Sequence, residues 1–328
     1  MEKTDQVLIN QWHPVAQVEE LQPGIVLSKR LLGEDIVLWC YEDRILAWQD
    51  FCPHRGVRLS LGWVQGDTLV CPYHGLAYNL EGKCASLPPN PDQAIPYRAC
   101  IRTYQTQECY GLIWVCMGQP TQNILPFPEW DDSTYRKIIG GPYCYRSSPQ
   151  RAFENFLDTA HIHFLHKGIL GEPSHAQIDH HQVQWYPDGI TYAVNSWEHD
   201  FDDNGEDEMI FKNYKFNVFR PLTAHSQTAP VESEIDRRMA IFFTVTPVEE
   251  EECVVWIWMA LNYSHGIPTT EIEEALNIVS SQDITMVESQ RPRRLPLDSQ
   301  AEFHMFCDQS SVAYRKWLKH LGVTFGVI

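Results

Sequence analysis

Two short loops that each carry a cysteine and a histidine place the strongest constraint on what this chain can fold into. Cys52 stands two residues before His54, Cys71 stands three residues before His74, and sixteen residues separate the two pairs. Thiolates and imidazoles are metal ligands, and two ligand pairs on successive loops can bind one compact centre from both sides. The segment therefore predicts a metal centre between two neighbouring loops.

Two kinds of centre use two cysteines and two histidines. A structural zinc ion binds all four ligands itself, whereas a Rieske [2Fe–2S] cluster has two cysteines on one iron and two histidines on the other. Zinc fingers usually pair cysteine with cysteine and histidine with histidine, but here each loop supplies one of each. This pairing favours a Rieske cluster over zinc, with the ligands Cys52, His54, Cys71 and His74.

Length, charge and hydropathy narrow the class of protein. The chain has 328 residues, 44% of them hydrophobic, which is enough for two domains. The net charge of −18 argues against a nucleic-acid partner, because phosphate binding needs a basic surface. No run of residues suits a membrane span or a signal peptide. We expect a cytoplasmic protein whose ten cysteines are thiols or metal ligands.

Short strands are predicted for the first part of the chain. Residues 24–50 contain three segments of β-branched and aromatic residues between turn signals, and further strands fit residues 68–71, 76–80 and 111–116. The proline-rich passage from Pro120 to Pro128 predicts a domain boundary. We expect an all-β domain over residues 1–125 and a second domain over residues 126–328.

Helices and a hairpin are predicted for the second part. Residues 150–168 look helical up to Gly168, residues 237–262 read as an antiparallel hairpin, and a long helix is expected from Thr269 toward Gln290. The acidic run over residues 199–208 is interpreted as a solvated loop.

The first predicted helix carries candidates for a second metal site. Glu154, Asp158 and His161 are spaced to share one helical face. His166 would point about 140° away from His161 on an ideal helix, so both histidines reach one metal only if the helix bends or ends there. A carboxylate would complete the facial triad of a mononuclear iron(II) oxygenase.

The long helix supplies that carboxylate. Asp283 lies where an apolar residue belongs, within a stripe that should face the core: Ile272, Leu276, Val279, Asp283, Met286 and Gln290. A buried carboxylate needs a cation or a proton. We predict Asp283 as the third ligand rather than a salt-bridge partner of Arg291 or Arg294. Glu288 and Asp298 are weaker candidates, because Glu288 lies off the stripe and Asp298 follows Pro292.

These motifs resemble those of a known family. Cys52-Pro53-His54-Arg55-Gly56 and Cys71-Pro72-Tyr73-His74-Gly75 resemble the signature of Rieske proteins. The spacing Asn155-x-x-Asp158-x-x-His161-x₄-His166 resembles the iron motif of Rieske non-heme iron oxygenases, and residues 281–290 resemble the segment that supplies their carboxylate. The resemblance implies an α+β fold, with an all-β Rieske domain followed by a catalytic domain of helix-grip type, in which helices flank an antiparallel sheet.

The resemblance also implies roles for individual residues. His161, His166 and Asp283 would hold the mononuclear iron, and Asn155 would lie near it. Asp158 would hydrogen-bond His161 and reach His74 of an adjacent subunit, which implies a head-to-tail homotrimer. Walls of the substrate pocket are expected from residues 239–262 and from the helix that carries Phe156 and Leu165.

Three further segments are similar to those of cyanobacterial oxygenases that tailor saxitoxin-type guanidinium alkaloids. They are residues 128–132, 289–297 and 313–328. None has an identified chemical role, so this narrower likeness places the chain near a branch of the family and does not fix a substrate.

The chemistry implied is oxidation by O₂ with external electrons. The chain lacks the G-x-G-x-x-G strand–turn–helix of a dinucleotide site, so NAD(P)H would act only through a separate ferredoxin or flavin reductase. We expect hydroxylation of a C–H bond in a small molecule, and the narrower likeness suggests a guanidinium alkaloid. Oxidative O- or N-demethylation or aromatic ring dihydroxylation would use the same irons, and a Rieske electron-transfer protein is a remote alternative.

Overall fold

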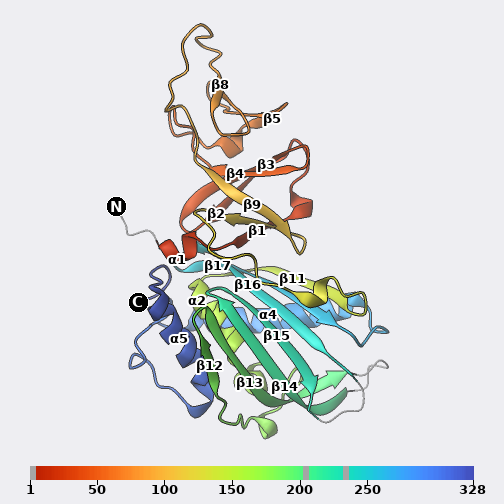
Figure 1. Cartoon of the computed structure of the whole chain (residues 1–328). Coiled ribbons are helices and arrows are strands. Elements are labelled where there is room, and N and C mark those ends of the chain that lie inside the picture. The colour runs from red at the N-terminus through yellow and green to blue at the C-terminus, as the bar shows by residue number, and fades with distance from the viewer. Residues whose placement is uncertain (1–4, 202–206, 232–235) are drawn as a thin grey trace. The chain divides into compact units, whose positions relative to one another are not determined.

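The computed structural model describes residues 5–201, 207–231 and 236–328, and the chain divides into two compact units between Ile124 and Leu125. Each unit builds its own sheets (Figure 1). Within the described residues, no helix is both long and apolar enough to cross a membrane. Short 3₁₀ turns connect several elements: η1 (Val18–Glu20), η2 (Leu59–Leu61), η3 (Pro128–Trp130), η4 (Pro173–His175) and η5 (Phe306–Asp308).

The first unit contains a six-stranded antiparallel sheet that follows a short helix, α1 (Gln6–Ile9). The three strands predicted for residues 24–50 are present and pair in sequence. The order across the sheet is β1 (His13–Gln17), β10 (Leu112–Cys116), β9 (Thr103–Cys109), β4 (Arg44–Gln49), β3 (Glu34–Tyr41) and β2 (Val26–Leu31).

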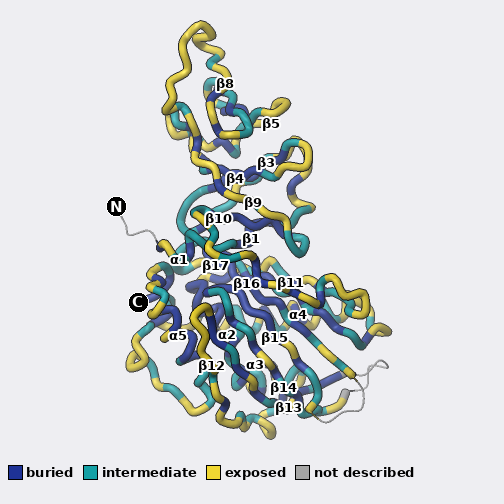
Figure 2. Tube along the Cα trace, viewed as in Figure 1, coloured by how far each residue is buried: buried dark blue, intermediate teal, exposed yellow. Residues whose placement is uncertain are grey.

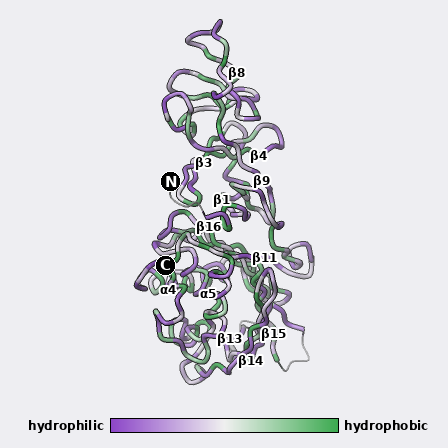
Figure 3. Tube along the Cα trace, turned by 60° about the vertical axis from the view of Figure 1, so that its left-hand side comes forward, coloured by the Kyte–Doolittle hydropathy of each residue, from purple (hydrophilic) through white to green (hydrophobic). Residues whose placement is uncertain are grey.

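A smaller four-stranded sheet carries the two Cys–His loops. Its order is β5 (Trp63–Gln65), β6 (Thr68–Val70), β7 (Ala77–Tyr78) and β8 (Cys84–Ser86). Cys52 and Cys71 are buried in one apolar cluster with Trp39, Trp48 and Tyr78. This core therefore joins the strands of the larger sheet to the base of both loops. The loop after β8, residues 88–98, is exposed (Figure 2) and mainly hydrophilic (Figure 3).

The second unit is built on a seven-stranded antiparallel sheet. Its order is β11 (Arg136–Tyr145), β17 (Glu252–Leu261), β16 (Met239–Glu249), β15 (Thr223–Pro230), β14 (Asp207–Arg220), β13 (Gly189–Phe201) and β12 (Val183–Tyr186). The hairpin predicted for residues 237–262 is confirmed as β16–β17.

Four helices pack with this sheet: α2 (Pro149–Leu157), α3 (Ile162–Leu165), α4 (Thr269–Ser289) and α5 (Gln309–Leu321). The long helix predicted from Thr269 is confirmed as α4. Its buried residues are Leu276, Ser280 and Val287. The predicted stripe was wrong at its end, because Met286 is 46% exposed and Gln290 is exposed.

The prediction of one continuous helix over residues 150–168 was wrong. Helix α2 ends at Leu157, Asp158 has extended backbone angles, and helical structure resumes only at Ile162. The Asp158 side chain accepts a hydrogen bond from the backbone N–H of Ala160 at 2.7 Å. Such a local side-chain turn competes with helix continuation, so the chain changes direction before His161.

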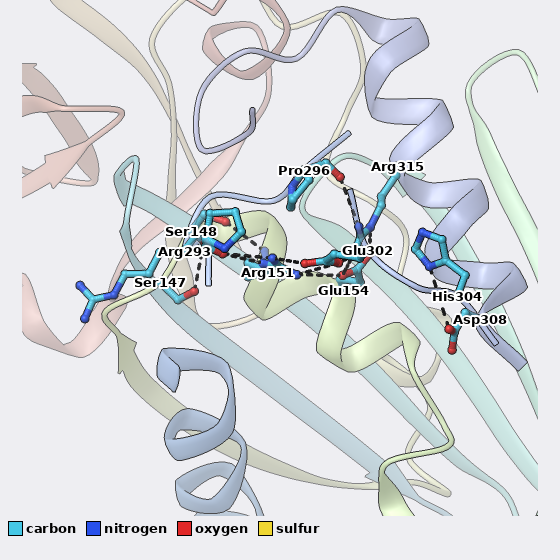
Figure 4. Close-up of polar contacts among 11 residues, drawn as sticks. Ser147, Ser148, Arg151, Glu154, Arg293, Pro296, Glu302, His304, Asp308 and Arg315 are labelled. Carbon is cyan, nitrogen blue, oxygen red and sulfur yellow. Dashed lines mark hydrogen bonds and ion pairs between the residues drawn. The ribbon is translucent and has the colours of Figure 1, made fainter. Parts of the chain in front are cut away.

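A buried ion-pair network fixes α2 (Figure 4). Arg315 of α5 binds both carboxylate oxygens of Glu154 at 2.6 and 2.7 Å, and it also contacts Glu302 at 2.7 Å. Arg151 binds Glu302 at 2.6 Å. Glu154 therefore faces α5 instead of sharing the face of Asp158 and His161, and the expected common face is corrected.

The acidic run over residues 199–208 is not simply a solvated loop. His199 and Asp200 belong to β13, and β14 begins at Asp207. Asp200 is 4% exposed and accepts hydrogen bonds from Lys212 and Arg237. Residues 202–206 of this run lie outside the described residues.

Candidate metal centres and substrate cavity

The two Cys–His loops share one backbone geometry. In each loop the cysteine N–H donates to the carbonyl five residues later, and the glycine N–H donates to the cysteine carbonyl, at 2.8–3.0 Å. Gly56 and Gly75 both have a φ of 72°, which glycine adopts without strain. The glycines after each histidine thus allow two equivalent tight loops.

In this pair of loops the sulfur donors are more deeply buried than the nitrogen donors. Cys52 and Cys71 are 2% and 1% exposed, whereas His54 is exposed and His74 is partly exposed. The two imidazoles lie side by side, with their Nδ1 atoms 3.2 Å apart. Burial raises the pKa of the Cys71 thiol, and the adjacent Cys52 thiol adds to this effect. The arrangement provides two sulfurs on the inner side and two nitrogens on the outer side.

This donor set fits a binuclear cluster better than one zinc ion. Ligands of a single tetrahedral zinc lie no more than about 4 Å from one another. Among the described residues, only His161, His166 and Asp283 bring three such donor atoms within 4.8 Å of one another. No three of the Cys and His donors of the loops lie that close together, which fits ligands divided between two bridged irons.

The second donor group meets where α2, α3 and α4 come together. His161 immediately precedes α3 and His166 immediately follows it, so one helical turn lies between them. Asp283 comes from the middle of α4. Its Oδ1 lies 3.5 Å from His161 Nε2 and 3.2 Å from His166 Nε2. Helix α3 ends before His166, whose φ of −104° and ψ of 31° are not helical, so the two histidines do not have the separation of about 140° that a continuous helix would give.

The surroundings of Asp283 leave room for a cation. Its Oδ1 is buried and has no hydrogen-bond partner. Arg294 contacts Glu250, and Arg291 donates to the backbone carbonyls of Glu288 and Gln290, so neither arginine pairs with Asp283. Two imidazole nitrogens and an unpaired carboxylate oxygen are the ligand types of a facial iron triad.

The alternative carboxylates are engaged elsewhere. Glu288 accepts a hydrogen bond from the backbone N–H of Arg146 at 2.8 Å, and Asp298 accepts one from Gln300 at 3.0 Å.

A cavity of about 540 Å³ adjoins the triad within the second unit. Its walls are mainly apolar and come from the sheet, from α2 and from α4. Asn155 and Phe156 line it, whereas Leu165 is not among the lining residues. The β16–β17 hairpin contributes as predicted, through Met239, Ile241, Phe243, Ile257, Met259 and Leu261.

Comparison with known proteins follows the same two-part division. Residues 11–105 match the model of the Rieske [2Fe-2S] domain, and residues 145–323 match that of the vanillate O-demethylase oxygenase C-terminal domain. The methylxanthine N1-demethylase NdmA of Pseudomonas putida is 30% identical over 94% of this chain and 88% of its own length. The chain belongs to the Rieske non-heme iron oxygenases.

Two further relatives agree with this assignment. A vanillate O-demethylase oxygenase subunit of a Pseudomonas species is 26% identical over 94% of the chain and 92% of its own length. The solved structure of NdmA from Pseudomonas putida CBB5 with caffeine superposes with a TM-score of 0.82, at 27% identity, over 96% of this chain and 91% of that one. The oxygenase therefore has the predicted fold of a Rieske domain followed by a catalytic domain.

Asp158 of the oxygenase lies beside the triad. Its Oδ2 is 3.4 Å from His161 Nδ1, and its side chain is 37% exposed. Burial opposes ionisation of Asp158, but hydrogen bonding from His161 and the charge of that imidazole outweigh it and lower the pKa of Asp158. Asp158 therefore contacts His161 while part of its side chain is open to solvent.

Two residues near the metal centres were missed by the sequence reasoning. Gln282 Oε1 accepts a hydrogen bond from His166 Nδ1 at 2.8 Å, which leaves the Nε2 lone pair free to face Asp283. Tyr78 OH lies 3.2 Å from Cys52 Sγ. From the sequence alone, Gln282 could have been suggested only by its position next to Asp283. Tyr78 could have been suggested only by its nearness to Cys71.

Proposed function

We propose that this oxygenase oxidises a C–H bond of a small molecule held in the cavity of the second unit. The observation that carries the proposal is the meeting of His161, His166 and Asp283 at the wall of a mainly apolar cavity. Bound there, iron would supply the activation of O₂, with electrons from a separate reductase by way of a Rieske cluster on Cys52, His54, Cys71 and His74.

The residues of the chain have defined tasks in this proposal. Gln282 orients His166, and Asp158 orients His161. The apolar walls hold the substrate carbon close to the triad and keep bulk water away. Asn155 lines the same cavity and would lie near the metal.

Oxidative demethylation is the second candidate. It is favoured by the similarity to a methylxanthine N1-demethylase and a vanillate O-demethylase oxygenase subunit. Hydroxylation of an N- or O-methyl group gives a product that releases formaldehyde, so demethylation begins with the same C–H oxidation. Ring dihydroxylation has no such support here.

A guanidinium alkaloid remains the narrower substrate proposal. The segments that suggested it do not line the cavity. Glu129, in residues 128–132, is buried and accepts hydrogen bonds from His225 and Gln227 at 3.0 and 2.7 Å. Arg315, in residues 313–328, binds Glu154. These segments have structural roles, so the proposal must stand on the cavity itself.

Assembly as a homotrimer is part of the proposal. Asp158 is partly exposed, and Cys307 lies near enough for the charge of Asp158 to raise the pKa of its thiol, after burial and Asp308. Phe303 and Phe306, close in sequence to Cys307, are 89% and 85% exposed. Apolar side chains at such a surface fit contact with another chain. His74 of a neighbouring subunit would then reach Asp158.

The reductase partner and the compartment follow from the same chemistry. Rieske oxygenases of this type receive electrons from a separate reductase. The ten cysteines are thiols in the described part of the chain, which suits a reducing cytoplasm.

The test is product analysis under ¹⁸O₂ with purified reductase, NAD(P)H and candidate substrates. Hydroxylation should add one labelled oxygen, and demethylation should release formaldehyde in step with loss of a methyl group. A product whose new oxygen comes from water, with label from H₂¹⁸O and none from ¹⁸O₂, would contradict the proposal. So would product formed equally well by Asp283→Ala.

A further inference from the structure

Part of the cavity lining differs chemically from the rest. The buried residues of β13 alternate along the strand, and their character changes from apolar to acidic: Tyr192, Val194, Ser196, Glu198 and Asp200. Alternation places all of them on one face of the sheet. Glu198 and Asp200 line the cavity together with Lys212 and Tyr214 of the adjacent strand β14. Two carboxyl groups therefore reach a cavity whose other walls are mainly apolar.

Asp200 is fully engaged by protein groups. It accepts hydrogen bonds from Lys212 Nζ at 2.9 Å, from Arg237 at 3.2 Å and from Tyr263 OH at 3.2 Å. Lys212 also donates to the His199 carbonyl at 3.0 Å. This carboxylate has no need of a ligand, and its role is structural.

Glu198, in contrast, does not have hydrogen-bond donors for both of its carboxyl oxygens. The residue is 2% exposed, its Oε2 accepts a hydrogen bond from Tyr214 OH, and its Oε1 has no hydrogen-bond partner. A buried carboxyl oxygen without a donor is costly. The missing donor can come from whatever occupies the cavity.

Glu198 also shares its cavity with the triad. It lines the same cavity as His161, His166 and Asp283. A group held by Glu198 would therefore occupy the cavity that the proposed metal ligands face. Burial raises the pKa of Glu198 itself, an effect that the charge of Lys212 opposes.

We infer that Glu198 is a specificity-determining residue whose Oε1 accepts a hydrogen bond from a cationic nitrogen group, such as an amidinium or ammonium, of the substrate. The inference deepens the proposed function and rests on it, because it assumes that this cavity receives the substrate. A cation supplies both the missing donor and a charge that favours the ionised carboxylate, whereas a neutral amide supplies only the donor.

The test compares two probes of nearly equal shape, benzamidinium and neutral benzamide, by isothermal titration calorimetry on the iron-loaded, full-length oxygenase. The wild type should bind benzamidinium roughly tenfold or more tightly than benzamide. Glu198→Gln should abolish this preference. Glu271→Gln is the matched control, because Glu271 lines the same cavity but is exposed. It removes the same charge and should keep the preference within about twofold.

Several results would overturn the inference: equal binding of the two probes, no binding of benzamidinium at millimolar concentration, or an undiminished preference in Glu198→Gln. The wild-type comparison stands alone if that variant fails to fold. An oxygenase that holds its iron but shows no cation preference would refute only this inference. Failure to bind iron at the triad would instead refute the proposed function.

Discussion

Gln282 is the residue that fixes the His166 imidazole of the proposed iron triad. It holds His166 Nδ1 at 2.8 Å, so that Nε2 faces Asp283. Gln282→Leu removes the acceptor, and the iron affinity should fall about 10–100-fold. The measurement is retention of the mononuclear iron against a chelator. Thr285→Ala is the control, since Thr285 is exposed and bonds only the Ser281 carbonyl. Equal retention in both variants would show that Gln282 does not position the ligand.

Tyr78 should tune the other centre. Its hydroxyl lies 3.2 Å from Cys52 Sγ, within hydrogen-bonding range of this proposed cluster ligand. A hydrogen bond to sulfur stabilises the more negative, reduced cluster, so Tyr78→Phe should lower the reduction potential. Redox titration followed by electron paramagnetic resonance measures this shift. Tyr97→Phe, at a residue that is 97% exposed, should leave the potential unchanged. A potential that does not fall in Tyr78→Phe would refute the assignment.

At the scale of elements, the network between α2 and α5 holds the helix that leads to Asp158. Arg315→Met leaves Glu154 buried without its bidentate partner, and the free energy of unfolding should fall by about 3–5 kcal/mol. Denaturant unfolding measures the loss. Arg238→Met breaks an ion pair with Asp236 whose side chains are 60% and 71% exposed, and it should leave the free energy of unfolding nearly unchanged. Similar losses in both variants would count against a stabilising network.

Elements with a clear local period could be predicted from the sequence. The β2–β4 meander, the β16–β17 hairpin and α4 each carry their own turn or helix signals. The break at Asp158 could not, because a side-chain hydrogen bond to Ala160 overrides an apparently helical pattern. The burial of Asp200 could not be predicted either, because its cationic partners Lys212 and Arg237 lie on other segments of the chain.

The residues of the candidate site also divide into those that could be predicted from the sequence and those that could not. The cysteine and histidine ligands could be proposed from spacing, and Asp283 from a carboxylate in an apolar stripe. Gln282, Tyr78 and Glu198 could not, because their roles depend on contacts that only the folded chain creates.

At the scale of the whole molecule, electron transfer should cross between subunits. Asp158 touches His161 and is partly exposed, so Asp158→Asn should leave both metal centres largely occupied while slowing oxidation of the Rieske cluster in a single turnover by at least about 100-fold. The variant should still elute as a trimer in size-exclusion chromatography with light scattering. Cluster oxidation at the wild-type rate, or full activity of a monomeric preparation, would show that the bridge and the ring are not required.

The central claim is that one chain carries two different iron centres, with Asp283 a ligand of only one. Iron and acid-labile sulfide analysis of the wild type and Asp283→Ala tests this without knowledge of the substrate. The account predicts about three irons and two sulfides per chain in the wild type. Asp283→Ala should have about two of each, with an unchanged Rieske signal. Zinc without labile sulfide in the wild type, or a third iron retained in Asp283→Ala, would contradict it.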